Sequence, residues 1–335
     1  MEQTNPVETS PVEKMPRRWR WGINRWWILL FIILTVVGTS FIAPVMPHIQ
    51  VAPESLLEKP LVTLPLIGAI PLTNSLVAML LVDVILIALA YTVYRNSKKG
   101  SLVPTGVSGF FEMLIEMLYN LTENTAGRWA KKIFPWFATI LILVLFTNLV
   151  KMIPGFESIG LLHHAEEGHP IQQVFGNVYT VTGGDVVPGE GYVVTPFLRG
   201  TSTDLNFTVA LALISVIMTQ VIGVRAQGPR YFSKFLNFTT MFKKPFLGFM
   251  DFIVGVLELI SEFAKILSFS FRLFGVMFSG VVLVAIVSQM VPVFVPSLIY
   301  FFELFMGVIQ AFVFGMLTMV FMSQATQGHG GEEHK

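Results

Sequence analysis

Residues 258–275 read ELISEFAKILSFSFRLFG, a series of charged and hydroxyl side chains inside an otherwise apolar segment. The surrounding run, Leu247–Met290, contains no proline, so it can form one continuous helix. At ~1.5 Å per residue this helix would be about 66 Å long, more than twice the roughly 30 Å hydrocarbon layer of a bilayer. We therefore expect it to lie strongly tilted or nearly flat within a membrane.

The polar residues of this helix recur at three- and four-residue steps, which places them on one helical face. That face should point at protein or water, while the Leu, Ile and Phe side chains meet lipid. Its members are Glu258, Ser261, Glu262, Lys265, Ser268 and Arg272.

The composition of the whole chain also indicates a membrane protein. Charged residues are 13% of the 335 residues, about half the roughly 25% of a typical soluble protein, and hydrophobic residues are 53%. The formal net charge of +1 gives no support for nucleic-acid binding. With no cysteine, disulfides and thiolate metal sites are excluded. The predicted fold class is an all-α polytopic membrane protein.

Six apolar runs are long enough to be membrane helices. The first is an extra N-terminal helix, and the last two are long and strongly tilted. They are Trp26–Ala43, Ser75–Tyr94, Phe134–Ile153, Asn206–Val224, Leu247–Met290 and Ser297–Met322. The core is therefore expected over residues 75–322, between a disordered cytoplasmic tail at 1–25 and a second tail at 323–335. A cleaved signal peptide is the alternative for the first run, because a basic flank and an apolar stretch fit both.

The basic residues give the predicted orientation. If six spans alternate and both termini are cytoplasmic, most of the 22 Lys and Arg residues fall on the cytoplasmic side. Residues 104–126 carry apolar and acidic side chains on different faces and should form an amphipathic helix at the cytoplasmic interface. The outer loop, residues 155–204, is rich in Gly and acidic residues and is expected to hold a hairpin.

Arg272 is the most informative charge. Its neighbours are apolar, no acid follows within two turns, and a guanidinium stays protonated at any accessible pH. It must find its counter-charge on another helix or another chain, because charges at membrane depth are costly. The residues Glu258, Glu262 and Lys265 fit two readings equally well, a functional polar face or a structural cluster whose charges neutralise one another. Glu303 and Gln310 lie seven residues apart and share a face of the last helix. A fixed cation, a titratable acid and an amide describe an ion pathway.

Several motifs carry a resemblance to a known family. The run Ser268-Phe-Ser-Phe-Arg272-Leu-Phe-Gly275 resembles the signature of subunit a of F-type ATP synthases, and so does Ile309-Gln310-Ala-Phe-Val-Phe314. Further matches are Phe134-Pro-Trp, Asn148 with Ile153-Pro-Gly155, and Thr203-Asp204-Leu-Asn206. Glu258 and Lys265 also occupy the usual family positions. Three positions depart from the family pattern. Val276 stands where many members have Asn, and Val281 stands where members commonly have Glu or His. Lys151 stands where an apolar residue or Asp is usual.

The resemblance implies a stator subunit beside a rotating ring of c subunits, with subunit b of the peripheral stalk, the rest of the F1F0 complex and the lipid bilayer as further partners. It implies two half-channels, with Arg272 between their ends, that couple proton flow to ATP synthesis in a bacterial plasma membrane. The proton path is expected to use Glu303 and Gln310, the face of Glu258, Glu262 and Lys265, and Asn148 and Asn206. No cofactor is implied. The chain lacks the Walker nucleotide motif and should make no ATP alone.

Two other classes of protein share some of these features. A secondary ion transporter would also hold intramembrane charge, but it usually shows two related halves, which this chain lacks. A membrane-embedded hydrolase is the other class, but its His-Glu-x-x-His motif is absent from this sequence. Asp83, in the second span, either lines a channel or pairs with a neighbour, and Asp204 precedes the fourth span. The outer histidines His163, His164 and His169 are expected in a solvated loop, where they could gather protons near a channel mouth, and not in a metal site.

Overall fold

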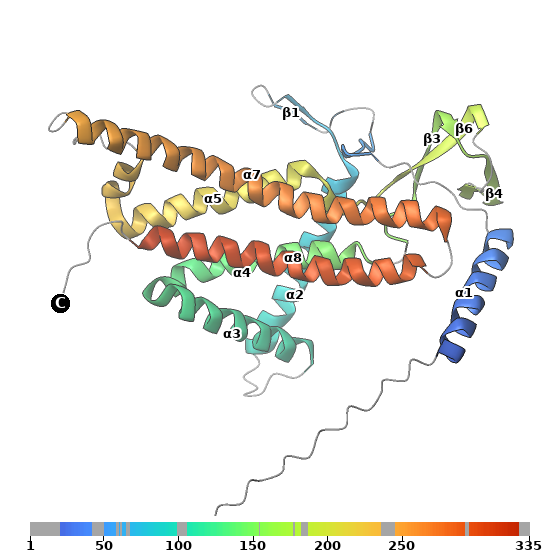
Figure 1. Ribbon diagram of the computed structural model, residues 1–335, viewed down its shortest axis with the longest axis horizontal. Coiled ribbons are helices and arrows are strands. Elements are labelled where there is room, and N and C mark those ends of the chain that lie inside the picture. The colour runs from blue at the N-terminus through green and yellow to red at the C-terminus, as the bar shows by residue number, and fades with distance from the viewer. Residues whose placement is uncertain are drawn as a thin grey trace, which may run out of the picture.

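The computed structural model of the chain describes residues 21–41, 50–57, 60, 62–64, 68–98, 106–153, 155–176, 178–181, 187–235, 245–291 and 295–327. Long helices lie side by side, and small hairpins gather on one side of them (Figure 1). Within these described ranges, five helical segments are long and apolar enough to cross a membrane: Asn74–Lys98, Ser108–Val150, Leu205–Gln227, Phe252–Met290 and Val295–Thr326. This confirms the prediction of an all-α polytopic membrane protein.

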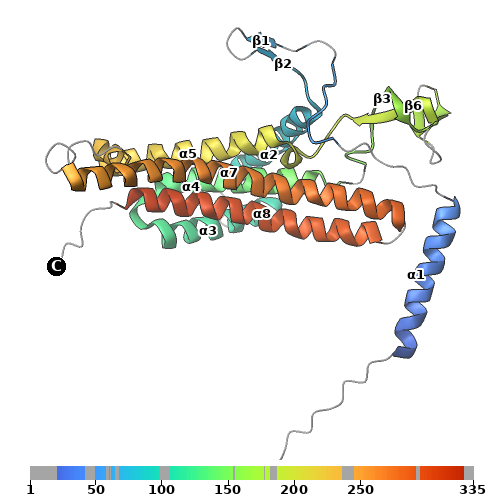
Figure 2. The same cartoon turned by 45° about the horizontal axis from the view of Figure 1, so that its top comes forward.

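The first helix, α1 (Trp21–Phe41), stands apart from the bundle in both views (Figures 1 and 2). It begins at Trp21, so residues 21–25 are helical and do not belong to the predicted tail. The reason is local, since these five residues contain no proline and lead directly into the apolar run. Trp26, Trp27 and Ile28 are all more than half exposed, a surface suited to lipid. Of the predicted tails at 1–25 and 323–335, residues 1–20 and 328–335 lie outside the described residues, and residues 323–326 belong to the last helix.

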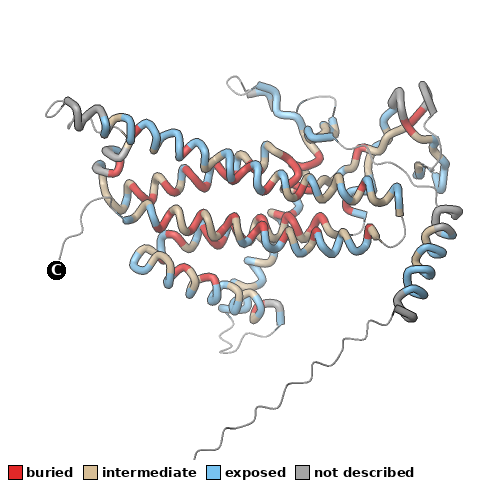
Figure 3. The backbone as a smooth tube through the Cα atoms, in the orientation of Figure 1, coloured by how far each residue is buried: buried red, intermediate tan, exposed pale blue. Residues whose placement is uncertain are grey.

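The bundle consists of α2 (Asn74–Lys98), α4 (Ala130–Val150), α5 (Leu205–Gln227), α7 (Pro245–Met290) and α8 (Val295–Thr326). The expected unbroken helix is present as α7, and it lies along α5 and α8 (Figure 2). Buried side chains of α4, α5, α7 and α8 form the central core, and Figure 3 shows buried positions along these helices. The core residues are Ile140, Val144, Leu211, Ala212, Phe269, Leu273, Met277, Ala311 and Phe314.

Close packing and polar contacts must hold this core, because lipid tails are as apolar as its side chains. Gly315 shows how close the helices come. A Cβ atom at this position of α8 would lie 2.9 Å from Cβ of Leu141 on α4, so only glycine permits the approach. Ser215 and Thr318 add a hydroxyl contact of 2.8 Å between α5 and α8.

The predicted amphipathic helix is α3 (Val107–Ala126), between Gly106 and Gly127, both of which have positive φ. Its acidic residues Glu112, Glu116 and Glu123 are exposed. Leu118 is buried with Phe137 of α4 and Met319 of α8, so the apolar face packs largely on the bundle and not on lipid alone.

The outer loop forms hairpins, as expected. Strands β3 (Gly160–Gly168) and β6 (Val187–Pro196) pair antiparallel, and so do β4 (Ile171–Phe175) and β5 (Val178–Val181). A short pair, β1 (Val62–Leu64) and β2 (Gly68–Ile70), precedes α2. We call the side of the molecule with these strands the hairpin side. Helix α3 lies on the opposite side (Figure 1).

Candidate functional site

Arg272 lies on an exposed face of α7. Its guanidinium donates to Ser268 Oγ at 3.3 Å, one helical turn away. Within the described ranges, no carboxylate is within ion-pair distance of Arg272. The chain therefore leaves this cation open to a partner outside the bundle. We define the Arg272 face as the exposed positions Ser268, Phe271, Arg272, Gly275 and Ser279.

Glu262 and Lys265 form an ion pair three residues apart on α7, with Nζ and Oε1 at 3.0 Å. The Lys265 ammonium also lies 4.9 Å from the ring centre of Phe321, near the end of α8. Glu262 is buried, while Glu258 and Lys265 are half-buried. The polar positions of α7 thus divide between a packed group near Phe321 and the exposed Arg272 face.

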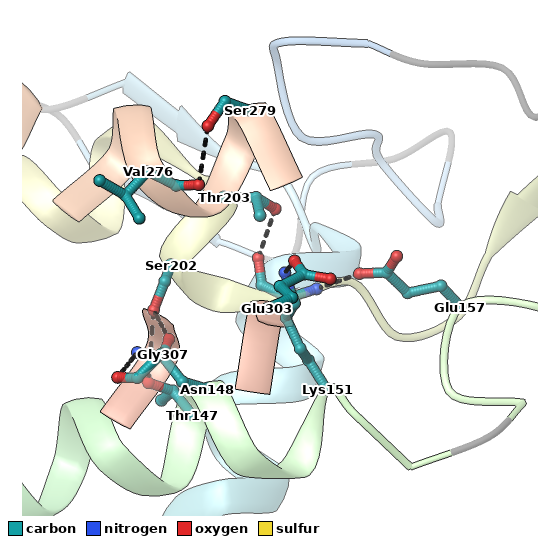
Figure 4. A network of polar contacts seen from close by, with 11 residues as sticks. Thr147, Asn148, Lys151, Glu157, Ser202, Thr203, Val276, Ser279, Glu303 and Gly307 are labelled. Atoms are coloured by element: carbon teal, nitrogen blue, oxygen red, sulfur yellow. Dashed lines mark hydrogen bonds and ion pairs between the residues drawn. The ribbon is translucent and has the colours of Figure 1, made fainter. Parts of the chain in front are cut away.

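Glu303 on α8 pairs with Lys151, which directly follows α4 and lies 152 residues away in sequence (Figure 4). Both side chains are only 4% exposed. Across from the pair lies Gly280 of α7, where a Cβ atom would come within 2.8 Å of Glu303 Oε1. The absence of a side chain at Gly280 lets Glu303 fit between α7 and the end of α4.

Asn148 ties three segments together one turn before Lys151 (Figure 4). Its Nδ2 donates to the carbonyl of Gly307 on α8 at 3.0 Å, and its Oδ1 accepts from Ser202 Oγ at 2.6 Å. Ser202 belongs to the short helix η2 (Thr201–Thr203) and lies 3.4 Å from Thr147 Oγ1. All these side chains are buried. A polar seam therefore runs from the hairpin side into the bundle.

Asp204 extends this seam toward α2. Its Oδ2 accepts from Ser75 Oγ at 2.5 Å, and its Oδ1 caps α5 by accepting from the Asn206 backbone N–H at 2.9 Å. The Asn206 side chain is exposed and does not join the buried seam. Asp83 is half-buried on α2, two turns from Ser75.

Gln310 lies two turns after Glu303 on α8 and is 5% exposed. Its Nε2 atom has no hydrogen-bond partner among the described residues. An unpaired buried amide is costly, so this side chain suits a position that water or a partner's polar group reaches.

The outer histidines lie away from Arg272. His163 and His164 are exposed on β3, and together with Glu54 they line an open pocket of about 480 Å³ on the hairpin side. Among the described residues, no three His, Asp or Glu side chains are placed to hold a metal ion.

Two buried polar groups thus lie on either side of Arg272 along α7. Glu262 and Lys265 precede it, and Gly280, opposite Glu303, follows it. The helical rise puts Glu262 about 15 Å before Arg272 and Gly280 about 12 Å after it. Glu262 and Glu303 are therefore separated by roughly 27 Å along α7.

The sequence does not predict the pairing of Lys151 with Glu303 or the role of Ser202. In the sequence, Lys151 is notable only as a departure from the family pattern. An unusual cation at the end of an apolar span, facing an unusual acid elsewhere, was the available signal.

These features define a class, namely a polytopic membrane protein with an exposed cation on a long membrane helix and buried polar groups on both sides of it. Residues 76–323, about three quarters of the chain, match the family described as ATP synthase A chain. The chain belongs to this family, subunit a of the membrane sector of F-type ATP synthases. It is thus an integral membrane component of an F1F0 complex.

Individual relatives agree. The chain is 32% identical over 230 residues to "ATP synthase subunit a, sodium ion specific" of Propionigenium modestum, an alignment covering 68% of this chain and 66% of that relative, just under two thirds. It is 28% identical over 264 residues to ATP synthase subunit a of Moorella thermoacetica, covering 78% and 95%. With ATP synthase subunit a of Helicobacter pylori strain Shi470 it shares 29% over 237 residues, covering 70% and 83%.

Proposed function

We propose that the chain is the stator against which a ring of c subunits turns, and that it forms two proton half-channels that couple proton flow to ATP synthesis. The observation that carries the proposal is the placement of Arg272. It is exposed on a membrane helix, has no carboxylate partner among the described residues, and lies between two buried polar groups.

The physical role of Arg272 follows from its fixed charge. A ring carboxylate that arrives protonated from lipid would give up its proton beside Arg272, because a nearby cation favours the charged form. After passing, it would take a proton from the second half-channel and return to lipid neutral. The cation also repels protons and so blocks a direct leak. Each charge crossing 100 mV supplies about 2.3 kcal/mol for rotation.

We assign the half-channel on the hairpin side to Glu303, Lys151, Gln310 and the buried seam around Asn148 and Asp204. The half-channel on the opposite side uses Glu258, Glu262 and Lys265. With the hairpin side outside the cell, both termini are cytoplasmic, and the membrane is the bacterial plasma membrane. The chain binds no nucleotide, and subunit b of the peripheral stalk holds it against the ring.

The proposed coupling ion is H⁺. One relative is named as sodium ion specific, so sodium is the alternative coupling ion. The buried carboxylate on the hairpin side, Glu303, is neutralised by the Lys151 ammonium, which opposes entry of a metal cation. ATP synthesis driven by a proton gradient, and not by a sodium gradient, is the expected result.

The test of the proposal replaces Arg272 in the assembled complex, reconstituted into vesicles. Arg272→Ala should abolish proton-driven ATP synthesis while the complex still assembles, and Arg272→Lys should fail or nearly fail because a compact ammonium lacks the planar guanidinium fork. Arg225→Ala, at an exposed position in the last turn of α5, is the matched control and should synthesise ATP normally. Normal synthesis by Arg272→Ala would refute the proposal.

A further inference from the structure

The buried ion pair raises a question about charge. Lys151 and Glu303 are both almost fully buried, and each is neutralised by the other. If Glu303 takes up a proton, the Lys151 ammonium becomes a buried charge without a partner, which is strongly unfavourable. A proton relay through Glu303 therefore needs a group that compensates the Lys151 charge while Glu303 is protonated, and a second carboxylate within reach would supply it.

Glu157, in the turn before β3, meets this requirement. Its Oε1 accepts from the Gly200 backbone N–H at 2.9 Å. A Cβ atom built on Gly200 would lie 2.8 Å from Lys151 Cδ and 3.3 Å from Glu157 Oε1, so these two atoms are no more than about 6 Å apart. The Lys151 ammonium is two bonds beyond Cδ. A change of side-chain rotamer can therefore carry it from Glu303 toward Glu157.

Two glycines determine which side chain can move. Gly280 of α7 presses against Glu303, where even a Cβ atom would come within 2.8 Å of Oε1, so Glu303 has little room on that side. Gly200 makes room for the aliphatic stem of Lys151, because a Cβ atom at this position would lie 2.8 Å from Lys151 Cδ. We therefore assign the change of rotamer to Lys151 and not to Glu303. Figure 4 shows Lys151 reaching Glu303, with Glu157 nearby.

Among the residues that the structure describes, few other polar groups face Glu303. Lys151 reaches it from the end of α4, Tyr300 from α8 itself, and α7 offers only Gly280 at this point. Glu303 is buried, whereas Glu157 is exposed on the hairpin side.

We propose that Lys151 alternates between Glu303 and Glu157, which makes Glu157 a further positioning residue of the proton path. The proposal rests on the proposed function. A hydronium ion on the hairpin side gives its proton to the Glu303 carboxylate and becomes water. The Lys151 ammonium keeps its three hydrogens and pairs with the Glu157 carboxylate. When Glu303 passes its proton inward, Lys151 returns to it.

The test uses the assembled complex in vesicles and measures the rate of ATP synthesis against the proton concentration on the hairpin side. Glu157→Gln keeps an acceptor for Gly200 and removes the charge, so folding should be preserved. Protonation of Glu303 in this variant leaves the Lys151 ammonium without a carboxylate partner. The proton concentration on the hairpin side that gives half-maximal synthesis should therefore rise about tenfold, equivalent to one pH unit, while the maximal rate stays unchanged. Glu157→Asp should behave like the parent protein. Glu54→Gln removes an equal charge on the same side and is the matched control.

A double variant tests the mechanism more strictly. Because Glu157 acts only through Lys151, Lys151→Met with Glu157→Gln should need the same proton concentration as Lys151→Met alone. An unchanged proton requirement in Glu157→Gln, or independent effects that multiply in the double variant, would overturn the proposal. Arg272→Ala in the same vesicles separates the failures: if it abolishes synthesis while Glu157→Gln resembles the parent, only the switch is wrong.

Discussion

The hydrogen bonds of Asn148 give a stability prediction whose size can be worked out. Asn148→Ala removes a bond to the Gly307 carbonyl and a bond from Ser202. A typical internal hydrogen bond contributes a net of roughly 0.5–1.5 kcal/mol, so the two together contribute about 1–3 kcal/mol. Since about 1.4 kcal/mol is tenfold, the folded-to-unfolded ratio should fall about 5- to 150-fold.

The effect of alanine on the helix itself must be separated from this loss. Alanine favours a helix over asparagine by up to about 0.7 kcal/mol, which partly masks the cost. Asn120→Ala, on the exposed surface of α3, brings the same propensity gain without breaking the seam and is the matched control. It should leave stability unchanged or slightly raised. The free energy of unfolding of Asn148→Ala should fall below that of this control.

The assay is an SDS titration of the purified membrane-sector complex. The chain contains no cysteine, so a fluorophore on a single cysteine at exposed Phe110 reports unfolding of this subunit. A double-mutant cycle of Asn148→Ala with Ser202→Ala should give a coupling energy of about 0.5–1.5 kcal/mol. A coupling energy below about 0.3 kcal/mol would show that the contact contributes nothing and would refute the reasoning.

Three more predictions follow from the same geometry. Glu303→Gln should lower proton-driven synthesis by about 10²-fold or more, and Glu303→Asp should lower it less, because only aspartate can still titrate. Val281→Glu in the Glu303→Gln background should restore part of the rate. A parental rate in Glu303→Gln would show that Glu303 is not part of the proton path. Asp204→Ala loses the cap of α5 and the bond from Ser75 and should cost about 0.5–2 kcal/mol in the SDS titration, whereas Asp204→Asn should cost less. Gly315→Val would collide with Leu141 and should destabilise the α4–α8 contact by about 1–3 kcal/mol, with no effect on stability as the contrary result.

Much of the fold follows from local pattern. The apolar runs gave the membrane helices to within a few residues, because hydrophobic length and turn residues are local properties. The unbroken α7 and the amphipathic α3 could be predicted for the same reason.

The long-range pairs could not be predicted. Lys151 and Glu303 are 152 residues apart, Asn148 and Gly307 159, and Ser75 and Asp204 129. No local periodicity connects such residues, since only the packing of α4 against α8, and of α2 against the start of α5, brings them together. The resemblance did not supply the first pair either, because Lys151 departs from the family pattern. The side-chain environment of Glu303 therefore had to come from the structure.

The most direct test of the central claim is the contact between the Arg272 face and the ring. Single cysteines can be placed on α7 in this cysteine-free chain, each combined with a cysteine beside the membrane carboxylate of the c subunit. Phe271→Cys and Gly275→Cys lie on the exposed Arg272 face, whereas Met277→Cys is buried at 1% exposure and serves as the control. We predict oxidative cross-links to the c subunit from positions 271 and 275 and none from 277. Cross-linking absent from both exposed positions in assembled complexes would contradict the stator account.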